Sequence, residues 1–139
     1  MSDNKATILR LYEEVFSKGD LDLIDELMAD DFVEHEELPP GIPPGKAAPR
    51  ALMTMMHGAF PDFHATVEEL LEDGDKVIAR VRFSGTHQGE FMGIPATGKK
   101  FDIAVIDIIE LRDGKAVAHW GVMDMAGMME QLGLGGPPA

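Results

Sequence analysis

An aspartate in the middle of an apolar strand is the first residue whose position suggests chemistry. Side chains alternate between the two faces of a strand, so over residues 99–111 Asp107 shares a face with five apolar side chains: Phe101, Ile103, Val105, Ile109 and Leu111. A carboxylate in such a row is costly unless it is paired or protonated. Asp107 is therefore a candidate acid or base. The alternative is a structural aspartate, either hydrogen-bonded to a neighbouring Tyr or His or placed at an open sheet edge.

The residue opposite Asp107 depends on the hairpin turn that Asp113-Gly114 predicts. A two-residue loop places Trp120 across from Asp107, whereas a three-residue loop with a glycine bulge places His119 there. The sequence leaves both registers open. In the second register an acid faces an imidazole, and either could act as the base while the other orients or stabilises it. The alternative for His119 is a half-buried strand histidine without a catalytic role.

Other side chains could complete a site around this pair. Tyr12 lies on the apolar stripe of the first helix, where its hydroxyl could donate to a ligand oxygen or simply reach the surface from the core. His35 lies at the predicted rim of a pocket, and His87 and Phe91 lie on a long loop that could close over a ligand. Further predicted substrate contacts are apolar or aromatic residues at inward positions: Phe16, Met53, Met56, Phe60, Val105, Trp120 and Met123.

Several kinds of site are not indicated by the sequence. The histidines show no H-x-x-x-H, H-x-H or H-E-x-x-H spacing, so no metal is predicted. A nucleophile elbow, a phosphate-binding loop and a dinucleotide fingerprint are also missing. The expected chemistry is therefore acid–base chemistry by side chains, without a cofactor.

The hydrophobic pattern changes from a helical to a strand period along the chain. Helices are predicted over residues 3–17, from Asp20, from Pro49 and near the end, where Asp124 is either an N-cap or a site residue. Strands are predicted over residues 31–35, 63–71, 76–84, 99–111 and 115–123. This order favours an α+β fold: a curved, mostly antiparallel sheet wrapped around the N-terminal helices, forming a cone with an internal pocket.

Length and composition limit the partners of such a domain. The 139 residues suit one domain over 1–139, with 133–139 as a loose tail. Acidic residues outnumber basic residues 25 to 12, and the formal charge of −13 argues against binding to nucleic acid or a membrane surface. Cysteine is absent, and no apolar run approaches the roughly 18 residues of a membrane span. Without a signal-peptide pattern, we expect a cytoplasmic protein.

Three segments carry a family resemblance: A-D-D-F-V-E-H, G-T-H-Q-G-E-F-M-G-I-P-A-T-G and D-G-K-A-V-A-H-W. Together they resemble the SnoaL-like polyketide cyclase family, which shares its cone fold with ketosteroid isomerase and nuclear transport factor two. The resemblance implies association into a homodimer or homotetramer through the sheet. It also implies an aldol-type ring closure of a hydrophobic carbonyl compound without metal or organic cofactor.

The resemblance also implies roles for four residues. Asp107 matches a pocket histidine of the cyclases and an enolate-binding acid of the isomerases. Tyr12 matches the isomerases' oxyanion tyrosine, His35 their proton-shuttling carboxylate, and His119 a histidine of the cyclases. One position departs from the family: the cyclases carry an acid–base aspartate two residues after that histidine, where this chain has Gly121.

The departure at Gly121 leaves three hypotheses open. The first is a cofactor-free cyclase or isomerase that transfers a proton next to a carbonyl, with Asp107 or His119 as base or acid, Tyr12 as oxyanion donor and His35 at the rim. The second is a non-catalytic domain of the same fold that binds a small apolar ligand. The third and weakest is a hydratase or epoxide hydrolase, which would need an acid and a base acting on one water.

Overall fold

The helices come first and the sheet afterwards, as the change in hydrophobic period predicts. The computed structural model describes residues 2–134. Its helical elements are α1 (Asp3–Arg10), η1 (Leu11–Ser17), η2 (Leu21–Leu23), α2 (Ile24–Leu27), α3 (Ala47–Ala59) and α4 (Met125–Gln131). Its strands are β1 (Met28–Glu34), β2 (His64–Asp73), β3 (Lys76–Thr86), β4 (Lys100–Arg112) and β5 (Lys115–Met123). In the described part of the chain, no helix is long and apolar enough to cross a membrane.

The first helix is positioned by its two ends. The Ser2 hydroxyl caps it by accepting from the backbone N–H of Lys5, and Gly19 ends it with a φ of 75° that favours glycine. The predicted helix over 3–17 is continuous, but from Leu11 onward it is wound as a π-helix. Such segments are rare and occur often at functional sites. This segment carries Tyr12, which is buried.

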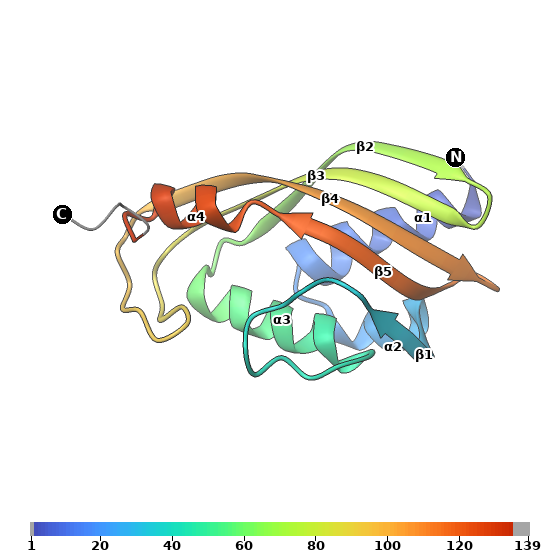
Figure 1. Cartoon of the computed structure of the whole chain (residues 1–139), viewed down its shortest axis with the longest axis horizontal. Coiled ribbons are helices and arrows are strands. Elements are labelled where there is room, and N and C mark those ends of the chain that lie inside the picture. Colours follow the sequence, from blue (N-terminus) through green and yellow to red (C-terminus); the bar gives the residue numbers. More distant parts are fainter. Residues whose placement is uncertain (1, 135–139) are drawn as a thin grey trace.

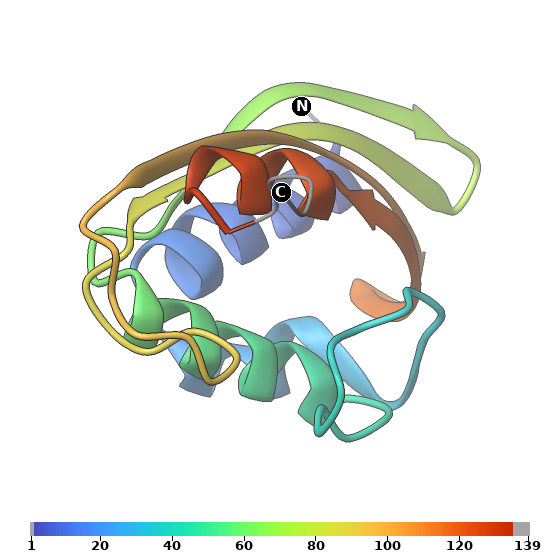
Figure 2. The same ribbon diagram turned by 60° about the vertical axis from the view of Figure 1, so that its left-hand side comes forward.

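The five strands form one sheet in the order β1-β5-β4-β3-β2 (Figure 1). β1 runs parallel to β5, and the other neighbours are antiparallel. Turned by 60°, the sheet arches over α1, η1 and α3, with these helices inside its curve (Figure 2). The predicted α+β class is confirmed, as a mixed sheet that is not closed. The face of β4 that contains Asp107 lies toward the helices, because all six residues of its row are buried.

The register of β5 differs from both predicted registers. Arg112 pairs with Lys115, as a two-residue turn requires, but the pairing shifts by one residue between Glu110 and Leu111. This β-bulge places Gly121 across from Asp107, and neither Trp120 nor His119 lies there. Since a one-residue shift exchanges the two faces of a strand, the bulge turns His119 inward and leaves Trp120 on the outer face.

Other predicted details are corrected by local geometry. The expected N-cap at Asp20 makes no side-chain cap hydrogen bond, and the helix expected from Pro49 begins at Ala47. The N-cap alternative for Asp124 is confirmed, because its side chain accepts from the backbone N–H of Gly127 at 2.9 Å. Most of the predicted loose tail, residues 135–139, lies outside the described residues.

Candidate active site

Tyr12, Asp107 and His119 converge on the concave side of the sheet. The Tyr12 hydroxyl donates to Asp107 Oδ2, and His119 Nε2 lies 2.7 Å from Asp107 Oδ1. Asp107 is 4% exposed and Tyr12 is 1% exposed, so this contact is shielded from water. The structure therefore brings together three of the four residues that the sequence nominates as catalytic. Both oxygens of Asp107 have a donor, which satisfies its burial among apolar neighbours.

A second carboxylate holds the other side of the imidazole. His119 Nδ1 lies 2.6 Å from Glu34 Oε1, and the backbone N–H of Glu36 fixes the same oxygen at 2.9 Å. Burial alone lowers the pKa of His119, but hydrogen bonds to Asp107 and Glu34 and their negative charges outweigh it and raise the pKa to about 10. His119 is therefore an imidazolium at neutral pH, with one N–H directed at each carboxylate.

A third carboxyl group, that of Glu36, faces the same imidazolium. Glu36 Oε1 lies 3.8 Å from His119 Nε2, and the side chain is 13% exposed. Burial, followed by the charge of Asp107, raises the pKa of Glu36 to about 7, and the charge of His119 opposes this shift only in part. Glu36 therefore exchanges its proton near neutral pH, a property that suits acid–base chemistry.

Gly121 provides the space that these groups occupy. A Cβ added at Gly121 would lie closer than 3.0 Å to side-chain atoms of Asp107, Glu36 and His119. The carboxyl groups of β4 and of the segment after β1 thus fill the volume where a side chain at position 121 would begin. Any larger residue there has to displace at least one of them.

These groups border an apolar cavity between the sheet and the helices. It has about 50 Å³ of room for water-sized molecules and about 630 Å³ of empty space in all when its open mouth is counted. Its polar lining consists of Tyr12, Glu34, Glu36, Asp107 and His119. The apolar lining comes from helices, strands and the segment after β1: Leu11, Phe16, Met28, Phe32, Leu38, Pro49, Leu52, Phe83, Val105, Ile109, Ala116 and Met123.

The predicted substrate contacts divide into two groups. Phe16, Val105 and Met123 line the cavity. The others do not: Met53 and Met56 are core residues, Phe60, His87 and Phe91 pack together elsewhere, and Trp120 lies on the outer face. His35 does not line the cavity either: it lies between Glu34 and Glu36, and its ring stacks on Trp120 with centroids 4.6 Å apart.

Glu34 and Glu36 are the site residues that sequence reasoning missed. The signal was the alternation within F-V-E-H-E, which places both glutamates on the same face as the buried Phe32 and turns His35 to the other face. Two acids in line with a core phenylalanine resemble Asp107 in its apolar row. The identification of His35 from its chemistry alone ignored this alternation.

Three residues of the site have atoms that could act as ligands to one metal ion. Atoms of Glu36, Asp107 and His119 lie within 4.8 Å of one another. A histidine must be neutral to bind a metal, and the raised pKa of His119 opposes this. The geometry favours the imidazolium as the cation that the carboxylates surround.

The fold and the site define a class of protein, namely an α+β cone with a buried acid–imidazole network at an apolar cavity. Within that class, the family model described as SnoaL-like polyketide cyclase matches residues 6–132. The chain belongs to this family.

Similar proteins include cyclases and solved structures from Streptomyces. The aklanonic acid methyl ester cyclase DauD of Streptomyces sp. (strain C5) is 33% identical over 91% of this chain and 80% of its own length. The nogalonic acid methyl ester cyclase of Streptomyces nogalater is 30% identical over 85% of this chain and 89% of its own length. The structure of IdmH from Streptomyces antibioticus is 37% identical, with a TM-score of 0.82 over 95% of this chain and 99% of that chain.

Proposed function

We propose that this protein catalyses an intramolecular aldol ring closure on a hydrophobic polyketide methyl ester. The observation that carries the proposal is the Asp107–His119–Glu34 network, in which a partly buried imidazolium lies between two carboxylates on the lining of an apolar cavity. The relatives of this chain include cyclases named for methyl esters of polyketide acids, and this supports the same substrate class for this protein. The reaction makes an isomer of the substrate.

Within residues 2–134 the site has one positive group, His119, to oppose the negative charge that such a reaction develops. Removal of a proton next to a carbonyl puts charge on the enolate oxygen, and ring closure then moves it to the oxygen of the attacked carbonyl. The imidazolium of His119, which Asp107 and Glu34 keep protonated, is the one positive group that the described residues place on the cavity lining, and it attracts this charge across the cavity without donating an N–H to it. Since His119 is already protonated at neutral pH, it serves as an electrostatic stabiliser rather than as the base.

Tyr12 and Asp107 hold the positively charged ring of His119 in position. The Tyr12 hydroxyl donates to Asp107, so its proton is directed at the carboxylate rather than into the cavity. Tyr12 donates to a substrate oxygen only if it exchanges this bond. Phe16, Val105 and Met123 would contact the apolar body of the substrate, with the bulk of it in the open mouth of the cavity.

Turnover of a matching substrate tests the proposal. We expect the purified protein, without added metal or cofactor, to convert a polyketide β-keto methyl ester into its ring-closed isomer, with unchanged mass by mass spectrometry. Asp107→Asn should lower kcat by about 10²–10³-fold and leave the substrate Kd within a few-fold, because it alters the network but not the apolar lining. Binding without turnover by the wild-type protein would contradict the proposal and favour a ligand-binding domain.

We also propose that copies of the chain associate through the outer face of the sheet, as a homodimer or homotetramer. That face exposes three large apolar side chains: Val122 is 73% exposed, Ile106 45% and Trp120 36%. β4 and β5 are neighbours, so these side chains lie on one surface. Apolar groups gathered on one surface are typical of a contact between subunits.

A further inference from the structure

We propose that Glu36 is the residue that moves the proton in this reaction. It would remove the proton from the carbon next to a substrate carbonyl and return it to the oxygen of the new alcohol. This inference rests on the proposed ring closure and adds the identity of its acid–base group. It is argued from the hydrogen bonds that occupy the neighbouring groups, from the position of Glu36 on the cavity, and from the space at Gly121.

The other ionisable groups of the cavity are committed to one another. Tyr12 donates to Asp107 Oδ2, and Asp107 Oδ1 accepts from His119 Nε2. The remaining N–H of His119 goes to Glu34, whose Oε1 also accepts a backbone N–H. Each of these groups would have to give up a buried hydrogen bond before taking a proton from carbon, and each such bond is costly to leave unmade.

Glu36 is the carboxyl group to which this network donates no hydrogen bond. One imidazolium has two N–H groups, and Glu34 and Asp107 take both of them. Glu36 stands 3.8 Å from His119 Nε2, close enough to feel its charge but beyond a hydrogen bond. Among residues 2–134, no side chain or backbone group donates to its carboxyl oxygens, so they are available to a substrate hydrogen.

The surroundings of Glu36 place it on the cavity lining and allow its proton to exchange. The charged or titratable groups that face it are Asp107 from β4, His119 from β5, Glu34 from β1 and Tyr12 from η1. From α3 the cavity receives only Pro49 and Leu52, which do not titrate. Burial, then two negative neighbours opposed by one positive neighbour, leave the protonated and ionised forms of Glu36 close in free energy near pH 7.

Gly121 is what allows three carboxyl groups to gather at one imidazole. Its missing side chain leaves the space that Glu36 and Asp107 oxygens occupy. An acid is therefore provided at this point of the cavity from the segment after β1 rather than from β5. The backbone N–H of Glu36, bonded to Glu34, fixes where that segment leaves the sheet.

The reaction balances with Glu36 as its only proton carrier. The carboxylate takes H⁺ from carbon, and the C–H electron pair becomes the enolate. The enolate carbon attacks a second carbonyl carbon of the same molecule, a C–C bond forms, and the carbonyl π pair moves to its oxygen. The Glu36 carboxyl group then gives its proton to that oxygen. No oxidant, reductant or water is consumed.

Two matched variants test this role. Glu36→Gln keeps the shape of the side chain but cannot accept the proton, so we expect kcat to fall by about 10²–10⁴-fold with Kd for the same β-keto methyl ester within a few-fold. Glu37→Gln is the control, since Glu37 is the exposed neighbour, and it should leave both constants unchanged. Glu36→Asp should retain more activity than Glu36→Gln, because it keeps a carboxylate.

The pH profile separates a proton carrier from a merely structural residue. For the wild-type protein kcat/KM should rise with pH through an inflection near 7, and Glu36→Gln should remove that inflection. A ¹³C carboxyl resonance titrating near pH 7 should disappear in the same variant. Wild-type turnover with an active Glu36→Gln of unchanged profile would overturn the role of Glu36 and leave the proposed function standing. A wild-type protein that closes no ring overturns both.

Discussion

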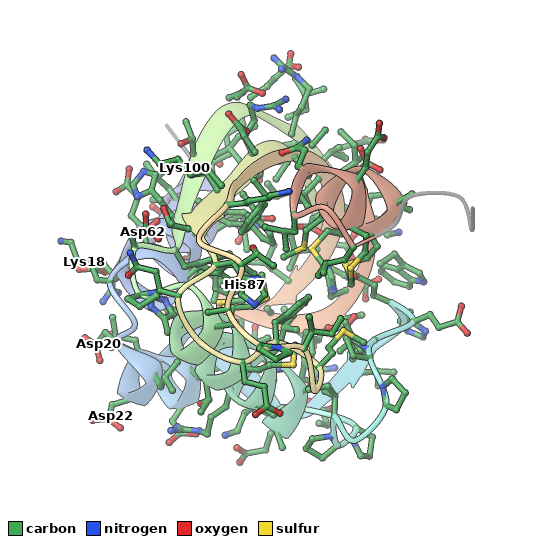
Figure 3. The ribbon with its side chains drawn as sticks, turned by 90° about the vertical axis from the view of Figure 1, so that its left-hand side faces the viewer. Lys18, Asp20, Asp22, Asp62, His87 and Lys100 are labelled. Carbon is green, nitrogen blue, oxygen red and sulfur yellow. The ribbon has the colours of Figure 1, made fainter. Side chains whose placement is uncertain are left out.

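Two histidines of this chain are withdrawn from water in different ways. His119 lies on β5 between two carboxylates, and each of its ring nitrogens has an acidic partner. His87 lies on the loop after β3 and is fully buried against Phe60 and Phe91. In Figure 3 His87 lies within the molecule behind that loop, whereas labelled charged residues such as Lys18 and Lys100 lie at the periphery. Burial alone therefore does not identify the functional histidine.

The partners of His87 give it a structural task. Its Nδ1 lies 3.0 Å from Thr97 Oγ1 and accepts from the backbone N–H of Thr97 at 3.3 Å. Backbone bonds in both directions join the same two ends of the loop, from His87 to Lys99 and from Gly98 to His87. Its Nε2 is buried and has no hydrogen-bond partner within residues 2–134. His87 thus closes the loop on itself, in surroundings of aromatic rings rather than charges.

The same substitution at both histidines should separate the two roles. His119→Gln removes the positive charge and should lower kcat by about 10²–10³-fold. His87→Gln should keep kcat within a few-fold, but it should lower the free energy of unfolding by about 1–3 kcal/mol because the side chain is buried and its bonds to Thr97 are part-buried. Turnover per folded molecule and urea denaturation measure the two effects.

The comparison would be reversed by the opposite pattern. If His87→Gln abolished turnover in protein that remained folded, the loop would have to reach the reacting atoms. If His119→Gln kept full kcat, the imidazolium would be only a structural part of the sheet. Either result would move the candidate site away from the cavity bordered by Asp107.

The difference between these histidines also shows how far sequence could go. The row that contains Asp107, the helix that carries Tyr12 and the fold class follow from period and turn chemistry, and the structure has them as predicted. His119 reaches Asp107 through a β-bulge, and nothing in K-A-V-A-H-W signals that extra residue. His87 and His35 are polar residues in suggestive segments, but loop closure and strand alternation decide where they point. The sequence therefore predicts which elements form and which residues they contain, but it does not predict how distant strands pair or where loop residues point.

The glycine opposite Asp107 offers a smaller perturbation of the same region. Gly121→Ala places a methyl group against the side chains of Asp107, Glu36 and His119, so we expect kcat to fall by about 10-fold or more as these groups shift. Gly58→Ala is the matched control, because nothing lies within 4 Å of its added Cβ. Alanine is also favoured over glycine within a helix such as α3. Steady-state kinetics on both variants measure the difference.

Equal kinetics for the two alanine variants would contradict this account of Gly121. They would mean that the Glu36 and Asp107 carboxyl groups move aside without consequence. The space at position 121 would then be incidental to the site.

The last comparison concerns stability rather than rate, and it sets Glu36 against its exposed neighbour Glu37. Folding raises the pKa of Glu36 from 4.5 to about 7, so between these pH values the folded state binds more protons than the unfolded state. The free energy of unfolding contributed by this group therefore falls as the pH rises through that window. Glu36→Gln removes the dependence. It should gain stability over the wild-type protein by about 3 kcal/mol at pH 8, relative to pH 4.

Urea denaturation at several pH values measures that gain, with Glu37→Gln as the reference. The high pKa of His119 cancels to first order, since both proteins contain this residue and lose its contribution over the same range, from pH 6.5 to about 10. Parallel stability curves for the wild-type protein and Glu36→Gln would show that Glu36 is ionised as easily in the folded chain as in water. A gain confined to high pH would instead show a carboxylate held at a cost to folding, as expected where a site needs a group that its surroundings do not fully pair.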